Sequence, residues 1–153
     1  MTKKIKWQIK ELRNSKHLNK SANVILKSRI ESLMSAVKKY SQSNTAENLH
    51  ELRIALRRVR YSMELFFVCF NKKEFLKFYN KIKNLQDLSG FTRDIDITLE
   101  NVYSVFGENT VSSNEDFMNK VLKKKEFLEE QFNKELNKFI NGKSFKDFYK
   151  LNF

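Results

Sequence analysis

The stretch LHELRIALRRVRYSMELFFVCF, residues 49–70, decides the fold that we expect for this chain. At about 100° per residue, its apolar side chains fall on one side of a helix, so that side is expected to be buried. These core-side positions are Leu49, Leu52, Leu56, Val59, Met63, Phe66 and Phe70. The opposite side, with Arg58 toward one flank, is polar: His50, Arg53, Arg57, Arg60, Tyr61 and Glu64. The spacing predicts a helix over about 45–70.

Apolar residues recur at three- and four-residue spacing through most of the remaining chain. The pattern predicts further long helices over 21–41, 74–106 and 115–140, and short helices over 3–13 and 144–153. We therefore expect an all-α protein, a four-helix bundle with short extra helices at the termini. Residues 1–20 are expected to be an N-terminal segment, and residues 21–153 the bundle domain.

Turn and capping signals divide these helices. Gly90 lies inside the third long helix, which indicates a kink or a close approach by a neighbour. The segment GENTVSSN, residues 107–114, is typical of a loop, and Gly142 predicts the end of the fourth helix. Two residue pairs have the spacing of a capping box at a helix start: Asn44 with Glu47, and Ser113 with Asp116.

The composition supports one helical domain and narrows the classes of protein. The chain has 153 residues, no proline and three glycines, whereas a β-rich domain normally needs more turn residues. A single cysteine, Cys69, excludes an intrachain disulfide bond. No apolar run is long enough to span a membrane, and the charged start lacks the apolar stretch of a secretory signal. We expect a cytoplasmic protein.

The positive charge is concentrated in the first half of the chain. The net charge is +12, and residues 1–70 hold 15 Lys and Arg against 5 Asp and Glu. Four of the seven arginines fall between residues 53 and 60. Arginine forms forked hydrogen bonds with phosphate oxygens, so this pattern favours a polyanionic partner: nucleic acid, an acidic membrane surface or a phosphate polymer. An ordinary solvated basic face is the alternative.

His50, Arg53, Arg57 and Arg60 line up along the predicted helix over 45–70, and we call these four residues the arginine row. Like charges four residues apart, as in Arg53 and Arg57, destabilise a helix. The pattern therefore favours a row of donors that binds an extended anion with repeated charges. Ile54, Leu65 and Val68 fall toward the same side and predict a groove between helices. In such a groove His50 would add a hydrogen-bond donor, although it can equally be a structural residue near the helix start.

Two motifs resemble the CHAD family, the conserved-histidine α-helical domain. The segment HELRIALRRVR, residues 50–60, resembles the family's H-x-L-R-x-x-x-R-R-x-R helix. LQDLSGFTRDID, residues 85–96, is similar to its L-Q-x-L-x-G-x-x-R-D-x-D segment, and the end of the chain resembles its closing helices. On these motifs the resemblance spans roughly residues 22–151.

The resemblance implies a helical bundle with a basic groove that binds inorganic polyphosphate, including the polymer stored in cytoplasmic granules. The contacts that it implies are His50, Arg53, Arg57, Arg58, Arg60, Arg93 and Lys27. Arg93 has an alternative role, a structural ion pair with Asp94 or Asp96. Family members typically contain two such bundles, and this chain has the length of one. Either the single bundle works alone, or two chains pair as a homodimer.

Enzymatic and nucleic-acid functions are the rival interpretations. The chain has two histidines and one cysteine, and Asp94 and Asp96 point to different sides of a helix, so we expect no metal, no cofactor and no catalysis. Nonspecific nucleic-acid binding is the stronger alternative, because a basic helix attracts any phosphate backbone. Most aromatic residues fall on core-side positions, however, which argues against base stacking.

Overall fold

The computed structural model describes residues 17–112 and 115–153, and these residues form helices joined by short connections. The elements are α1 (Leu18–Gln42), α2 (Ala46–Leu65), the 3₁₀ turn η2 (Phe67–Cys69), α3 (Lys72–Ser112), α4 (Glu115–Asn141) and α5 (Lys143–Asn152). The all-α prediction is confirmed. The short helix predicted over residues 3–13 and the capping residue Ser113 lie outside the described residues.

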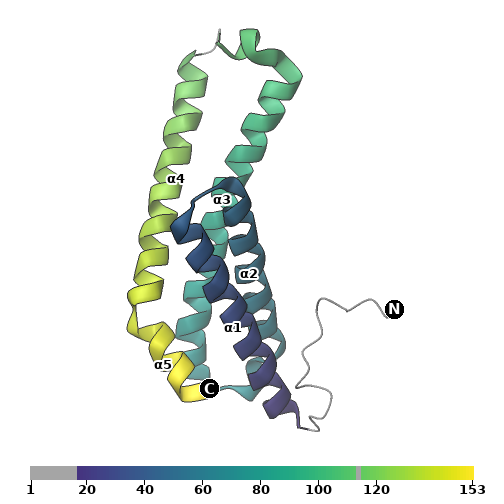
Figure 1. Cartoon of the computed structure of the whole chain (residues 1–153), viewed down its shortest axis with the longest axis vertical. Coiled ribbons are helices and arrows are strands. Elements are labelled where there is room, and N and C mark those ends of the chain that lie inside the picture. The colour runs from purple at the N-terminus through teal and green to yellow at the C-terminus, as the bar shows by residue number, and fades with distance from the viewer. Residues whose placement is uncertain (1–16, 113–114) are drawn as a thin grey trace, which may run out of the picture.

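The helices form an elongated antiparallel bundle (Figure 1). α1 packs on α2, α2 on α3, and α3 on α4, while α5 folds back against α3. Tyr40 of α1 meets Phe132 of α4 edge to face, with ring centres 5.7 Å apart, so the first and fourth helices also touch. Short connections place consecutive helices side by side, as expected for such bundles. α3 and α4 continue well beyond the α1–α2 connection (Figure 1).

The start of α2 differs from the predicted capping box of Asn44 and Glu47. The N-cap is Thr45, whose hydroxyl oxygen accepts a hydrogen bond of 3.2 Å from the backbone N–H of Asn48. The side-chain amide of Asn48 in turn donates to the carbonyl of Ser43 at 2.7 Å. Threonine, like asparagine, can accept a hydrogen bond from an unpaired backbone N–H of the first helical turn. The helix therefore begins one residue later than the pair of Asn44 and Glu47 indicates.

Gly90 neither kinks α3 nor receives a close neighbour, so that prediction is wrong. Its backbone is helical, and a Cβ built on it would meet nothing within 4 Å. The break in α3 lies at Gly107 instead, where φ is +70°, a left-handed conformation that glycine adopts without strain. Helix then resumes to Ser112, so the predicted loop over 107–114 is shorter than expected.

A phenylalanine-rich core holds the lower part of the bundle together. The seven core-side residues predicted for the second helix are all buried. Phe78 of α3 stacks on Phe148 of α5, with ring centres 4.5 Å apart and planes 4° apart. Phe148 is 1% exposed, and it also contacts Phe70 and Phe75. Burial of these rings is the main force that docks the short helix α5, because a ten-residue helix is marginal by itself.

Candidate anion-binding surface

The arginine row lies on the side of α2 that faces α3, not on the side directly opposite the core. Arg60 approaches Asp87 of α3, and Glu64, one turn further along, meets Tyr79 of α3. Arg53 and Arg60 are half-buried, whereas His50 and Arg57 are exposed. α3 therefore forms a wall beside the row. Since Leu65 and Val68 are 73% and 82% exposed, they do not form the second wall of the groove that the sequence predicted.

Arg60 is held by acidic neighbours. Its Nε donates to Oε1 of Glu64 at 2.9 Å, and its Nη1 lies 3.8 Å from Oδ1 of Asp87. The Tyr79 hydroxyl donates to the same Glu64 oxygen at 2.7 Å. Both hydrogen bonds, that from Tyr79 first, lower the pKa of Glu64, because they favour the charged carboxylate. Arg60 therefore has a structural role between α2 and α3 in addition to its positive charge.

The other members of the row have no acidic partner among the described residues. The side chains of His50, Arg53 and Arg57 form no hydrogen bond or ion pair with any residue of 17–112 or 115–153. Along this side of α2, Arg53 lies four residues before Arg57 and Arg60 lies three residues after it, whereas Glu47 lies three residues before His50. Guanidinium groups that lack an acidic partner and stand at a fixed spacing along a helix can bind an anion with several charges.

Gly90 leaves open space on the α3 side of the row. α2 and α3 are antiparallel, so the part of α3 beyond Asp87 lies beside the part of α2 before Arg60. This places Gly90 and Arg93 at the level of Arg53 and His50. Because a Cβ at Gly90 would touch nothing within 4 Å, an extended ligand beside the row meets no side chain at this position.

Lys83 is a basic residue beside the row that the sequence analysis missed. It lies on α3 one turn beyond Tyr79, and its positive charge helps to lower the pKa of Glu64. The signal available in the sequence was its spacing of four from both Tyr79 and Asp87, but their contact with α2 had to be known first. Lys83 adds a cation to the α3 side of the seam.

Arg93 makes neither of the ion pairs that the sequence suggested. Its Nη1 lies 3.5 Å from Oε1 of Glu100, two turns along α3. Asp96 instead joins α3 to α4 through Lys125, whose Nζ lies 2.7 Å from Oδ1 of Asp96. The Asp96 carboxylate raises the pKa of Lys125, which opposes the effect of burial on that ammonium group. Arg93 is thus partly neutralised, although it lies near the end of the row.

Arg58 lies apart from the row, on the side of α2 that faces α1. It borders a hollow of about 280 Å³ that is also lined by Ser32, Ser35 and Lys39 of α1. Glu51 borders the same hollow and accepts a hydrogen bond of 2.8 Å from the Lys39 ammonium group. An acidic side chain in the lining makes this hollow a poorer anion site than the row.

Lys27 is also separate from the row. A spacing of seven residues keeps Lys27, Met34 and Ser41 on one side of α1, and Ser41 faces α4. The body of α1 therefore stands between Lys27 and the seam of α2 and α3. Of the predicted contacts, the structure brings together His50, Arg53, Arg57 and Arg60, with Arg93 near one end, and it separates Arg58 and Lys27 from them.

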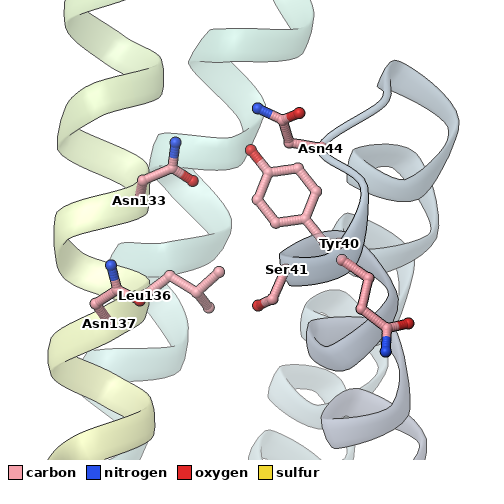
Figure 2. Close-up of a pocket in the computed structure, with 7 residues that line it drawn as sticks. Tyr40, Ser41, Asn44, Asn133, Leu136 and Asn137 are labelled. Carbon is pink, nitrogen blue, oxygen red and sulfur yellow. The ribbon is translucent and has the colours of Figure 1, made fainter.

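A second hollow, of about 400 Å³, lies between the end of α1 and α4, and its lining carries no charge (Figure 2). Figure 2 shows the Tyr40 hydroxyl group pointing toward the amides of Asn44 and Asn133. Burial, more than the nearby Glu129 carboxylate, raises the pKa of Tyr40. Tyrosine, serine and amide side chains offer neutral hydrogen bonds only, so this hollow does not attract a polyanion.

One exposed aromatic residue lies next to the row. Tyr61 is 56% exposed and follows Arg60 on the outward side of α2. Residues 17–112 and 115–153 contain no group of three or more His, Cys, Asp or Glu side chains that could hold a metal ion. No helix in this part of the chain has the length and apolarity needed to cross a membrane.

Comparison with known proteins gives one match. The sequence profile of the CHAD domain family matches residues 3–102, which include α1, α2, the arginine row and α3 as far as Val102. This span begins and ends earlier than the 22–151 expected from the motifs, and it leaves out α4 and α5. No curated protein and no solved structure matches the chain.

Proposed function

The chain belongs to the CHAD domain family, and from this premise we propose that it binds inorganic polyphosphate through the arginine row. The family is known for polyphosphate binding. The observation that carries the proposal here is the absence of any acidic partner for His50, Arg53 and Arg57 among the described residues. Polyphosphate is an extended polymer with regularly repeated negative charge, and it suits a row of cations along a helix.

The proposed site extends from the row to the neighbouring helix. Lys83 contributes a further cation on α3, and Gly90 leaves room for the polymer beside Arg53. Arg60 and Arg93 have acidic partners at the two ends, so they contribute less to binding than Arg53 and Arg57. We assign Arg58 and Lys27 no direct contact with the polymer bound at the row, because they lie on other sides of the bundle.

The proposal includes a non-catalytic role and a cytoplasmic location. Binding needs only hydrogen-bond donors and positive charge, and the row supplies both. Hydrolysis of the polymer would need an activated nucleophile or a metal centre beside the row, and the proposal invokes neither. Cytoplasmic polyphosphate, including polymer stored in granules, is the proposed target. Association of two chains as a homodimer is also part of the proposal, since it would offer the polymer two rows.

Nonspecific nucleic-acid binding is the second candidate function, and the exposed ring of Tyr61 favours it. An aromatic ring beside arginines can stack on an unpaired base, and such stacking is a common feature of single-strand binding proteins. Polyphosphate has no bases, so Tyr61 would contribute little to its binding. The same side chain therefore distinguishes the two functions.

Isothermal titration calorimetry with long-chain polyphosphate, with mixed-sequence duplex and single-stranded DNA as competitors, tests the proposal at physiological salt. We expect submicromolar binding of polyphosphate that DNA does not displace. Arg53→Ala with Arg57→Ala should weaken this binding strongly, since each lost charged hydrogen bond costs about 1.5–3 kcal/mol. Tyr61→Ala should leave it unchanged.

Two results would contradict the proposal. The first is equal affinity for polyphosphate and DNA that falls steeply and together as salt rises, which would indicate a generic basic surface. The second is a double variant that binds polyphosphate as tightly as the wild type. Arg58→Ala is the matched control, because it removes an arginine of the same helix from the side that faces α1.

A further inference from the structure

The α3–α4 hairpin, which projects beyond α1 and α2 (Figure 1), carries apolar side chains that the other helices leave uncovered. Among the described residues, thirteen large apolar side chains are exposed, and eight of them lie between residues 91 and 127. They are Phe91, Ile97, Tyr103, Val105, Phe106, Phe117, Leu122 and Phe127. Single exposed apolar residues are common, but a concentration of this kind marks a contact surface.

Helical spacing places several of these side chains along one flank of the hairpin. Phe91, Thr98 and Val105 are seven residues apart, so they share one side of α3. A hollow of about 570 Å³ lies on this side, and α4 contributes Lys124 and Leu128 to its lining. This hollow shows that the flank of α3 with Phe91 is continuous with the adjoining flank of α4.

The strip also includes two exposed rings of α4. Phe127 is 52% exposed, and the Lys124 ammonium group lies 5.7 Å from the centre of its ring. Phe117 lies seven residues before Lys124 and is also 52% exposed. We call the surface formed by Phe91, Ile95, Val105, Phe106, Phe117 and Phe127 the apolar strip.

The size of the strip fits a protein contact. A phenylalanine ring carries roughly 150–250 Å² of surface, and four rings of the strip are between 52% and 59% exposed. These rings alone leave roughly 300–500 Å² of apolar area in water, which is the apolar core of a standard interface of about 800 Å² per partner. The hollow between Phe91 and Leu128 has room for a side chain from the other partner.

The distribution of charge identifies a second copy of this chain as the partner. Residues 91–127 contain five Lys and Arg against seven Asp and Glu, whereas the rest of the chain contains 25 against 11. The hairpin is thus weakly acidic, and the body of the bundle is strongly basic. Glu115 and Asp116 are exposed toward the far end of the hairpin. Their charges are complementary to the basic body of another copy, not to its hairpin end.

We propose that the apolar strip is a dimer interface between two antiparallel copies of this chain. A two-fold axis near the middle of the strip places the acidic hairpin end of each copy beside the basic body of the other. Such an interface uses the same surface twice and closes at two copies. The inference gives a surface to the proposed homodimer, but it does not depend on polyphosphate binding, because no residue of the strip belongs to the arginine row.

Analytical ultracentrifugation of the full chain, from low micromolar to several hundred micromolar protein, tests the interface. We expect a reversible monomer–dimer equilibrium for the wild type that weakens as salt rises. Phe91→Glu with Phe127→Glu should be monomeric over the same range, because each introduces a negative charge into the strip. Val68→Glu is the matched control and should dimerise normally, because Val68 lies in the turn η2, outside the strip, and is 82% exposed in the wild type.

The outcomes separate the interface from the binding function. Circular dichroism should give the same helix content for the wild type and both variants. Titration should show that the double variant still binds polyphosphate. A wild type that stays monomeric throughout would overturn the inference, and so would a double variant that dimerises as the wild type does. Loss of polyphosphate binding by Arg53→Ala with Arg57→Ala, with dimerisation retained, would support both proposals separately.

Discussion

Replacing Arg57 by glutamine should stabilise the ligand-free protein against unfolding and weaken its binding of polyphosphate. Arg57 is exposed and has no acidic partner among the described residues, while Arg53 lies four residues before it and Arg60 three residues after. Glutamine has nearly the same helix propensity as arginine, so the change mainly removes charge repulsion. Each like-charge pair at this spacing costs about 0.2–0.5 kcal/mol.

The expected gain in stability is small but measurable. Arg60 is already paired with Glu64, so the pair of Arg53 with Arg57 contributes most of the repulsion. We expect Arg57→Gln to raise the free energy of unfolding by about 0.2–0.5 kcal/mol. For a domain of this size, that corresponds to roughly 1 °C in the melting temperature. The gain should shrink at high salt, because the repulsion between exposed charges is screened.

The binding change should have the opposite sign and be larger. One lost charged hydrogen bond of about 1.5–3 kcal/mol corresponds to roughly a ten- to more than hundredfold weaker binding of polyphosphate. Thermal unfolding followed by circular dichroism, at low and high salt, measures the first effect, and calorimetric titration measures the second. Lys38→Gln is the matched control, because Lys38 is exposed and has no charged residue three or four positions away.

Arg60→Gln should have the opposite effect on stability from Arg57→Gln, because Arg60 has acidic partners. Arg60→Gln removes the hydrogen bond to Glu64 and the contact with Asp87, so it should lower stability by a few tenths of a kcal/mol to about 1 kcal/mol. If Arg57→Gln destabilises the protein as much as Arg60→Gln, or leaves polyphosphate binding unchanged, then Arg57 is an ordinary structural residue and the reasoning about the row is wrong.

Two further predictions concern the fold. Gly90→Ala should raise the free energy of unfolding by about 0.5–1 kcal/mol, since the site is helical and open. Gly142→Ala should lower it by about 1–3 kcal/mol, because the added Cβ would lie 2.5 Å from the carbonyl oxygen of Lys138. Urea unfolding of both variants measures the difference, and equal effects would contradict the prediction. Because the pKa of Tyr40 is raised in the folded protein, its stabilising contribution is present below pH 10 and is lost as the pH rises through the folded pKa. Tyr40→Phe should therefore lose less stability than the wild type between about pH 8 and pH 11, and a parallel decline in both proteins would refute this.

The helices could be predicted from the sequence because each has a strong apolar period. All seven core-side residues predicted for the helix over 45–70 are buried, and Gly142 separates α4 from α5 as expected. The predicted end of that helix was wrong, because α2 ends at Leu65, and Phe66 and Phe70 lie beyond it. The local details were less predictable. Thr45 caps α2 in place of Asn44, since both side chains can accept the same hydrogen bond. Gly90 stays helical, because packing of the apolar residues around it outweighs the intrinsic cost of glycine.

The candidate site could be predicted in its main element but not in its extent. The spacing of His50, Arg53 and Arg57 depends on one helix, so the sequence was sufficient to align them. The contribution of Lys83 and the separation of Arg58 depend on which helix lies on each side of α2. Sequence spacing within one helix contains no information about that neighbour.

The sequence by itself therefore determined the all-α class, the core side of each helix and the alignment of the basic residues on α2, because these follow from a helical repeat within one segment. Only the tertiary structure decided that Arg60 is paired while Arg57 has no partner in the described part of the chain, that Arg93 meets Glu100, and that the α3–α4 hairpin leaves an apolar strip uncovered. Those features depend on the lengths and packing of different helices, which determine the distances between residues far apart in the chain.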